Sequence, residues 1–383
     1  MEYPIDSSGR PVLRWREHGC WQSAPWLTSS RAQPHREVVV VGDNLRADHA
    51  HRLASRGTAM LWRGNFRNAR QLLDALKRRL DRRLMKTGSD PADTFRRYRQ
   101  ARAHRASVLG MVLIELEPDL VIDLPYAPDV RRACRQAFGH SAERGVISLQ
   151  ELLGVIGAYE WRRHGVEVPE LGIRIHPHYG VFSPTRSEYV ALAVEAPLPD
   201  TATAFDIGTG TGVLAALLAR RGARRVVATD IEERAVACAR DNVRRLGLAD
   251  RVEIIQADMF PAGRADLVIC NPPWLPATPT SPLEAGVYDR GGRMLTTFVH
   301  RLPDHLTDNG EAWLLLSDLA EQLGLRTRTE LTDMFIRAGL IVRGRLDTHP
   351  RQRRARSGSD PLASFRTAET ISLWRLGRPS TPG

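Results

Sequence analysis

The sequence predicts an α/β protein whose second half is a doubly wound parallel sheet, preceded by a domain that is mixed α/β or helical. Two observations predict this fold class. From about residue 203, apolar runs typical of buried strands alternate with helical segments, as in units that build a parallel sheet with right-handed crossovers. A stretch rich in Pro, Gly and His at residues 168–184 separates this half from the first. A length of 383 residues leaves room for two domains.

The first half shows less regular patterns. Residues 1–36 carry scattered Trp, Pro and Ser without periodicity and predict an irregular lead-in. Four consecutive valines in residues 37–43 predict a strand covered on both faces. Leucines recur at three- and four-residue steps in residues 68–85, which indicates an amphipathic helix, and residues 149–162 have helical spacing again. We therefore place a first domain at residues 37–170.

The second half reads as an ordered series of elements, which we place in a domain spanning residues 180–377. The predicted strands are residues 204–208, 225–230, 252–258, 266–271 and 311–318, and the predicted helices between them include residues 213–222 and 234–247. Residues 339–347 and 370–376 predict a final antiparallel pair.

Composition excludes several classes. A hydrophobic fraction of 42% with 26% charged residues is ordinary for globular proteins, and no apolar run approaches the roughly 20 residues of a membrane-spanning helix. The first fifteen residues lack the basic and apolar regions of a signal peptide, so we expect a cytoplasmic protein. The cysteines are far apart, without zinc spacing, and predict buried free thiols: Cys20, Cys134, Cys238 and Cys270.

The net charge of +11 is compatible with a polyanionic partner such as RNA. Of the 55 basic residues only Lys77 and Lys86 are lysine, and such arginine usage also arises from coding bias. Arginines cluster between Arg63 and Arg105 and again between Arg351 and Arg356. Solvated surfaces and nucleic-acid contacts both remain open for these clusters.

A glycine-rich loop follows the strand at residues 204–208. Glycines let a chain turn sharply and let a ligand approach the backbone, while the next helix offers free N–H groups. The segment Gly210–Ala215 fits the dinucleotide pattern GxGxxA, and Asp230 lies 18 residues after Gly212, where an acid would bind a ribose. An NAD-dependent oxidoreductase is therefore one interpretation.

Three features favour S-adenosylmethionine instead. Asp206, just before the first glycine, suits the cationic amino-acid end of that ligand better than a pyrophosphate. Asp258 ends the next strand, where an adenine amino group would need an acceptor. The fourth strand ends in Asn271, Pro272, Pro273 and Trp274, a motif for which dehydrogenases have no use.

This series of strand ends resembles the class I S-adenosylmethionine-dependent methyltransferases, and within them the NPPY group with a methyltransferase small domain. That group includes HemK-type glutamine methyltransferases, RsmC-type ribosomal RNA guanine methyltransferases and N6-adenine enzymes. The resemblance covers about Gly180 to Leu376 and implies a Rossmann-like, seven-stranded catalytic sheet behind a substrate-recognition domain. The fourth motif position is more often Tyr or Phe in this group, so Trp274 is a departure.

The motif NPPW fits the chemistry of planar nitrogen. The lone pair of an amide or exocyclic amine is delocalised, so the nitrogen is a poor nucleophile. The side-chain oxygen of Asn271 and the backbone carbonyl of Pro272 could accept both N–H groups and orient the lone pair, while Trp274 offers a face for stacking.

Two segments extend the resemblance. Residues 180–193 are similar to the stretch that precedes the glycine loop in HemK-type and RsmC-type enzymes, and Arg186 in it is a predicted substrate contact. Residues 275–295 resemble the loop after NPPY in HemK-like proteins. His176 and His178 have no third ligand in view, so we expect no metal.

We therefore predict an N-methyltransferase with S-adenosylmethionine as cofactor, acting on a protein glutamine amide or an RNA base, with the translation machinery as a candidate partner and no membrane. The alternatives are an NAD-dependent oxidoreductase and a non-catalytic RNA-binding module. The predicted catalytic residues are Asn271, Pro272, Pro273 and Trp274; the predicted cofactor-binding residues are Asp206, Gly208, Thr209, Gly210, Gly212, Asp230, Asp258 and Asn271; and the predicted substrate contacts are Arg186 and Trp274.

Overall fold

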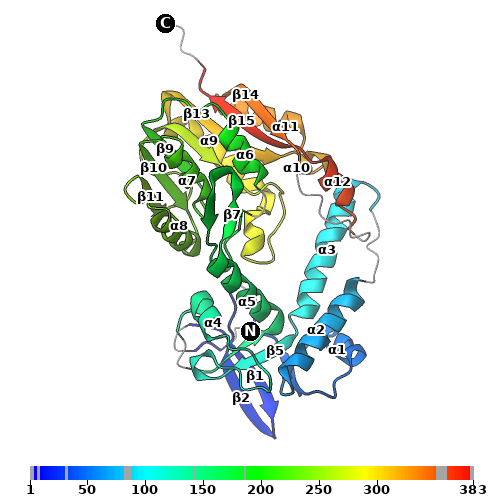
Figure 1. Cartoon of the computed structure of the whole chain (residues 1–383). Helices are drawn as coiled ribbons and strands as arrows, with labels where there is room; N and C mark the ends of the chain where they lie inside the picture. Colours follow the sequence, from blue (N-terminus) through cyan, green and yellow to red (C-terminus); the bar gives the residue numbers. More distant parts are fainter. Residues whose placement is uncertain are drawn as a thin grey trace. The chain divides into compact units, whose positions relative to one another are not determined.

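A computed structural model describes residues 4–6, 9–30, 33–81, 88–140, 143–184, 187–350 and 360–379. The chain forms two compact units (Figure 1). The N-terminal unit comprises Met1–Thr87 and Arg96–Glu160, and the C-terminal unit comprises Gly88–Phe95 and Trp161–Gly383. The first unit thus ends before the predicted limit at residue 170, and the short segment Gly88–Phe95 belongs with the second.

The C-terminal unit is built on a seven-stranded sheet with the order β11-β10-β9-β12-β13-β15-β14. The strands are β9 (Thr203–Ile207), β10 (Arg225–Asp230), β11 (Val252–Gln256), β12 (Ala265–Cys270), β13 (Leu306–Ser317), β14 (Ile341–Thr348) and β15 (Ile371–Gly377). Strands β9 to β13 are parallel, whereas β15 runs antiparallel to both of its neighbours. The predicted seven-stranded fold is confirmed.

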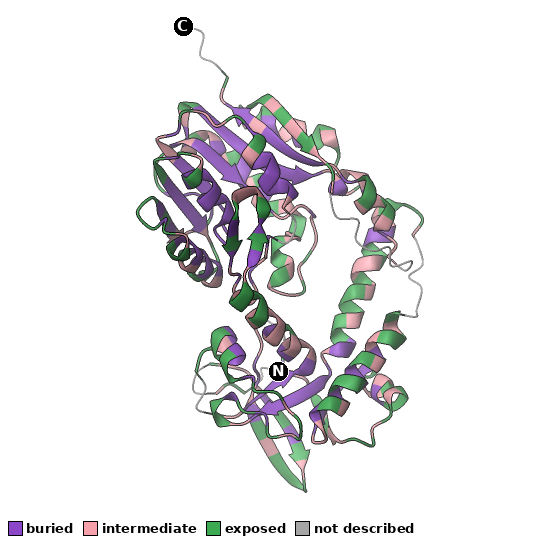
Figure 2. Cartoon of the chain, in the orientation of Figure 1, coloured by how far each residue is buried: buried purple, intermediate pink, exposed green. Residues whose placement is uncertain are grey.

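Helices cover both faces of this sheet. The helices are α6 (Glu188–Glu195), α7 (Val213–Arg220), α8 (Glu233–Arg245), α9 (Arg293–His305), α10 (Leu319–Gln322), α11 (Arg328–Arg337) and α12 (Ala363–Ala368). One hydrophobic core contains buried residues of α6, α7 and α8, and the other contains residues of α9 and α11. Successive residues of β12 alternate between them: Leu267 and Ile269 face the first core, Val268 and Cys270 the second. The inner strands are therefore largely buried (Figure 2), which explains their continuous apolar runs, whereas the edge strands β11 and β14 are partly exposed.

The N-terminal unit contains a four-stranded sheet with the order β3-β4-β5-β6, so of the two predicted classes it is mixed α/β. Its strands are β3 (Glu37–Val41), β4 (Thr58–Trp62), β5 (Val112–Leu116) and β6 (Gly145–Ser148), and the first three are parallel. Its helices are α1 (Ala47–Ser55), α2 (Phe66–Asp81), α3 (Pro91–Leu109), α4 (Arg131–Phe138) and α5 (Leu149–His164), of which α3 and α5 continue into the C-terminal unit. A small hairpin of β7 (Val166–Val168) and β8 (Ile173–Ile175) follows in the C-terminal unit.

Two predictions for the first half are wrong. Residues of the supposed irregular lead-in form a hairpin of β1 (Val12–Glu17) and β2 (Cys20–Pro25), because a short alternation of buried and exposed residues suffices for a two-stranded ribbon. The valine run forms β3, but this edge strand is half exposed, with Val39 at 36%, whereas β4 and β5 are the fully buried strands. Valines indicate a strand without indicating its place in the sheet.

Helix α2 confirms the predicted amphipathic helix as far as Asp81, and the remainder of that prediction lies outside the described residues. None of the helices in the described ranges has both the length and the hydropathy that crossing a membrane requires.

Candidate active site

The C-terminal unit gathers the predicted site residues at one edge of its sheet. Asp206 lies within β9 just before its end, Asp230 is the last residue of β10, and Asn271 directly follows β12. Since β10, β9 and β12 are adjacent and parallel, their carboxyl ends meet at the same edge. In open parallel sheets this edge is where ligands bind. Asp258 follows β11 with an exposed side chain.

The glycine loop between β9 and α7 requires its glycines. Gly208, Gly210 and Gly212 have φ of 72°, 56° and 82°, in the left-handed region that L side chains rarely adopt. A Cβ on Gly212 would lie 3.3 Å from Cα of Ala239, so α8 packs directly against the loop. A Cβ on Gly210 would meet no atom of the described residues within 4 Å, so among these residues the backbone is open to a ligand at this position.

Asp206 is fully buried, with 0% of its surface exposed, and only one of its two carboxylate oxygens is hydrogen-bonded within the described residues. Its Oδ2 accepts hydrogen bonds from Thr209 Oγ1 at 2.6 Å and from the Ala215 backbone N–H at 3.0 Å. Its buried Oδ1 accepts no hydrogen bond within the described part of the chain. Burial raises the pKa of Asp206 to about 7. A buried carboxylate oxygen without a partner is costly, and a cationic ligand group would satisfy it.

Asp230 is held by two backbone groups of the same region. Its Oδ2 accepts from Gly210 N–H and its Oδ1 from Glu232 N–H, each at 3.0 Å. These bonds fix the orientation of the carboxylate beside the glycine loop, and each oxygen retains a second lone pair for a hydroxyl donor. Burial raises the pKa of Asp230 above its ordinary value.

The NPPW segment contains a hydrogen bond that the sequence did not predict. The indole Nε1–H of Trp274 donates to Oδ1 of Asn271 at 2.9 Å. Since an indole N–H can bond only to the oxygen end of an amide, this contact defines which end of the Asn271 side chain is the acceptor. Trp274 is partly buried against both hydrophobic cores, so its ring is anchored rather than freely exposed.

Two loops meet beside this edge. A Cβ on Gly286, in the loop that follows Trp274, would lie 2.6 Å from Cβ of Phe182, so this loop packs on the segment preceding α6. A Cβ on Gly208 would lie 2.6 Å from Cε of Met294, at the start of α9, so this methionine covers the glycine loop. The predicted substrate contact Arg186 lies outside the described residues.

Sequence reasoning missed both Met294 and the contribution of Gly88–Phe95. The ring of Phe95 lies 6.4 Å from that of Tyr288, in the loop after NPPW. A methionine carries no motif signal, and a contact from a segment so distant in sequence leaves no local pattern.

The two histidines have protein partners. Nδ1 of His176 lies 2.7 Å from the Arg162 carbonyl oxygen, and Nε2 of His178 lies 3.3 Å from Oδ2 of Asp241. Burial lowers the pKa of His178. Across the described ranges, no group of three His, Cys, Asp or Glu side chains is arranged to hold a metal ion.

Strand order, glycine loop and acidic strand ends define the C-terminal unit as a class I S-adenosylmethionine-dependent methyltransferase. Residues 172–338 match the family described as Methyltransferase small domain. The comparisons favour S-adenosylmethionine over NAD.

Three relatives illustrate the range of this similarity. A Methanocaldococcus jannaschii protein, named as a candidate protein N5-glutamine methyltransferase, is 27% identical over 40% of this chain and 80% of its own. The release factor glutamine methyltransferase of Cereibacter sphaeroides is 44% identical over 22% of this chain and 32% of its own. The tRNA1(Val) (adenine(37)-N6)-methyltransferase of Shewanella sp. strain MR-4 is 32% identical over 24% of this chain and 42% of its own. The chain thus spans less than half the length of the latter two relatives.

Proposed function

We propose that the protein methylates a planar nitrogen, either a glutamine amide of a protein or an exocyclic amine of an RNA base. The observation that carries this proposal is the position of Asn271. Asn271 directly follows β12, and β12 lies next to β9 in the sheet. Strand β9 carries Asp206, whose buried Oδ1 accepts no hydrogen bond within the described part of the chain. An acceptor for N–H groups therefore lies at the edge where the cofactor would bind.

The residues of the chain have separate roles in this proposal. When bound, S-adenosylmethionine supplies an electrophilic methyl group. Asp206 would hold its ammonium end, Asp230 its ribose hydroxyls and Asp258 its adenine, while Gly208, Thr209, Gly210 and Gly212 would let it approach the backbone. Asn271 Oδ1 and the Pro272 carbonyl would accept the two N–H groups of the substrate and direct its lone pair, with Pro273 stiffening the segment. The proton becomes acidic as the new bond forms, so no strong base is required.

Trp274 would position Asn271. Its indole N–H takes one lone pair of the amide oxygen and leaves the other for a substrate N–H. It also prevents the amide from turning its NH₂ group toward the substrate, which would repel the substrate N–H. The edge of the ring would border the substrate, and Arg186 stays a predicted substrate contact outside the described residues.

The relatives guide the choice of acceptor. The names of two relatives give a release factor glutamine and a tRNA adenine as the methylated group. We therefore propose a component of the translation machinery as the acceptor, and the cytoplasm as the location. These names describe the relatives, and the acceptor of this chain is a proposal.

The test is methyl transfer from radiolabelled S-adenosylmethionine into a fractionated lysate, comparing the wild type with Asn271→Ala. We expect wild-type label in a nuclease-sensitive or protease-sensitive fraction and at least a hundredfold less label with the variant. Equal labelling by the two proteins would overturn the role of Asn271. No labelling by a wild type that binds S-adenosylhomocysteine would favour the non-catalytic RNA-binding module.

A further inference from the structure

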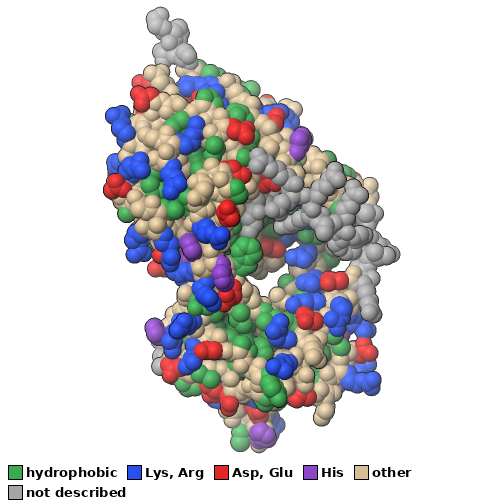
Figure 3. Space-filling model, in the orientation of Figure 1, with side chains coloured by type: hydrophobic (Ala, Val, Ile, Leu, Met, Phe, Trp, Pro, Cys, Tyr) green, Lys and Arg blue, Asp and Glu red, His purple; other side chains and the backbone are tan. Residues whose placement is uncertain are grey.

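The positive charge of the chain is concentrated in one unit. The N-terminal unit has 26 Lys and Arg against 16 Asp and Glu, whereas the C-terminal unit has 29 against 28. Formal net charges are thus +10 and +1, although the C-terminal unit is larger. Basic side chains are visible over the surface of both units (Figure 3), but only in the N-terminal unit do they outnumber acids substantially. A polyanion would therefore be attracted to the unit that lacks the methyl-transfer residues.

The β1–β2 hairpin has two chemically different faces. Leu13 and Trp15 are buried on its inner face. On the outer face Arg16 is directly opposite Trp21, whose side chain is 69% exposed, and Cζ of Arg14 lies 5.9 Å from the centre of the Trp21 ring. The outer face therefore presents a flat aromatic ring with the Arg14 guanidinium nearby and with Arg16, whose Nε–H donates to the Gly19 carbonyl, opposite it in the ladder.

The acidic residue of this hairpin, Glu17, is paired with an arginine outside the hairpin. Glu17 is the single Asp or Glu in the sequences of β1 and β2, and both of its oxygens accept hydrogen bonds from Arg63 at 2.8 Å. The same Arg63 pairs with Glu115 of β5 at 2.6 Å. Arg63 directly follows β4, so these bonds tie the hairpin to the carboxyl-end side of the small sheet.

A second exposed aromatic ring lies beside an arginine in the same unit. Tyr126 is 66% exposed, and Cζ of Arg67 lies 4.5 Å from the centre of its ring. Arg67 belongs to the first turn of α2, which follows β4, and Tyr126 lies in the segment that follows β5. The Phe66 backbone N–H donates to the Pro125 carbonyl at 3.0 Å, which holds these two segments together.

We propose that the N-terminal unit binds unpaired RNA, with bases stacking on Trp21 and Tyr126 and phosphates held by Arg14, Arg16 and Arg67. Every nucleotide of unpaired RNA supplies both a planar base and a phosphate, which match a ring and a guanidinium. An acidic peptide would match the guanidinium groups but would leave the exposed rings without a function. This inference rests on the proposed function and selects RNA as the acceptor class.

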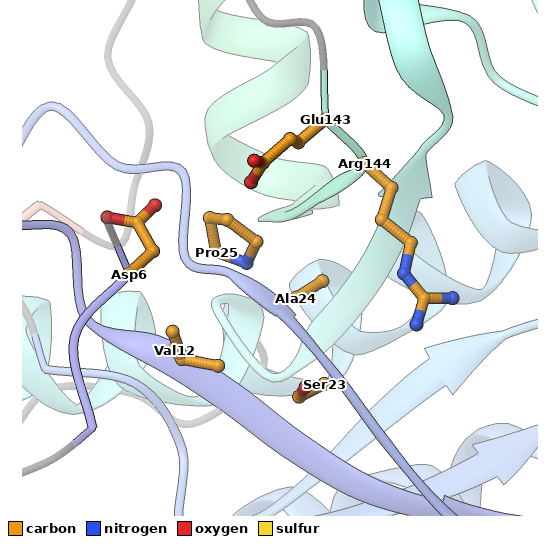
Figure 4. A pocket seen from close by; sticks show the side chains of 7 residues that line it. All are labelled: Asp6, Val12, Ser23, Ala24, Pro25, Glu143 and Arg144. Carbon is orange, nitrogen blue, oxygen red and sulfur yellow. The ribbon is translucent and has the colours of Figure 1, made fainter. Parts of the chain in front are cut away.

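A pocket at the other end of the hairpin does not belong to the proposed RNA-binding surface. It has a volume of about 400 Å³ and adjoins Val12, Ser23, Ala24 and Pro25 (Figure 4). Among the described residues, two acids, Asp6 and Glu143, border it together with one arginine, Arg144. Two carboxylates against one guanidinium do not suit a phosphate. The predicted basic cluster Arg351–Arg356 lies outside the described residues.

The test is fluorescence anisotropy of a labelled oligouridine of about 12 nucleotides, titrated with the full chain at several salt concentrations without methyl donor. We expect Trp21→Ala and Tyr126→Ala each to weaken binding about tenfold, and Trp21→Phe to restore most of the affinity because a ring is retained. The double variant Arg14→Gln with Arg67→Gln should reduce the salt dependence of binding.

Matched controls lie in the C-terminal unit. Trp161→Ala removes another exposed tryptophan, at 53%, and the pair Arg225→Gln with Arg264→Gln removes two exposed arginines, so both should leave binding unchanged. Unchanged affinity in a folded double variant Trp21→Ala with Tyr126→Ala would overturn the proposal. So would polyglutamate competing as strongly as RNA, which would indicate an acidic protein partner.

Failure of this inference is distinguishable from failure of the proposed function. The binding assay requires no methyl transfer, and Asn271→Ala should bind the oligouridine like the wild type. RNA binding that is unchanged in all of the aromatic variants would contradict this inference without affecting the methyl-transfer proposal.

Discussion

The two units use parallel strands for different purposes. In the C-terminal unit the strand ends carry Asp206, Asp230 and Asn271, which are wholly or partly buried. The two carboxylates accept hydrogen bonds from backbone N–H groups, and the Asn271 amide accepts one from the Trp274 indole. In the N-terminal unit the corresponding edge carries Arg63, and exposed rings lie in the hairpin and the segments after the strands. In our proposal, the residues for methyl transfer lie where water is excluded, whereas the positive charge that would attract a partner lies where it is exposed.

The largest effect should separate the two faces of the hairpin. Trp15 is 1% exposed, so Trp15→Ala should lower the free energy of unfolding by about 3 to 5 kcal/mol, because it removes a buried indole and leaves a cavity. Trp21→Ala on the outer face should change it by less than about 0.5 kcal/mol. Urea unfolding of the two variants measures both values, and similar losses would contradict the assignment of the outer face to binding.

The next effect concerns the glycine loop of the C-terminal unit. Gly208→Ala should weaken the binding of S-adenosylhomocysteine at least tenfold, since alanine is strained at φ 72° and its Cβ would contact Met294. Gly222 also has a positive φ, of 113°, with open space around a Cβ among the described residues, so Gly222→Ala is the control. Calorimetry should show full affinity for the control, and equal losses would mean that general destabilisation, rather than distortion of the glycine loop, weakens binding.

A smaller effect tests the contact between Trp274 and Asn271. Trp274→Phe keeps a ring but removes the indole N–H, so we expect kcat to fall about tenfold while affinity for S-adenosylhomocysteine stays constant. The indole N–H resonance of Trp274 should also shift in Asn271→Ala. An unchanged kcat would reduce Trp274 to a packing residue.

The smallest effect is a pH dependence at Asp206. Its folded pKa of about 7 lies above the ordinary 3.8, so ionisation costs stability, and the free energy of unfolding should fall as pH rises between these values. A ligand ammonium favours the ionised form, so S-adenosylhomocysteine should bind several-fold more tightly at pH 8 than at pH 6 with release of a proton. Calorimetry in two buffers should show that Asp206→Asn abolishes both effects; a pH dependence that persists in the variant would point to another group.

The sequence was most informative where local pattern and chemistry coincide. The strands from β9 to β13 were predicted because buried parallel strands are continuous apolar runs, and the final antiparallel pair β14 and β15 was predicted as well. The loop and the positions of Asp206, Asp230 and Asn271 followed from strand ends alone. Their roles in binding and catalysis remain predictions.

Features that depend on tertiary contacts could not be predicted. The edge position of β3 depends on which strands flank it, and the hairpin of residues 12–25 is too short for a reliable period. The indole bond to Asn271 depends on side-chain rotamers, and the packing of Met294 on Gly208 joins residues far apart in the chain. The charge asymmetry was present in the sequence, but it became visible only when the unit boundaries were known.

The most direct test of the central claim is to identify the methylated atom. RNA and protein that carry the label after incubation with the wild type would be hydrolysed to nucleosides and amino acids and analysed by mass spectrometry. We expect a methyl group on the exocyclic nitrogen of a base, and this product should be absent with Asn271→Ala. A methyl group on carbon or oxygen, formed equally by the wild type and the variant, would contradict it.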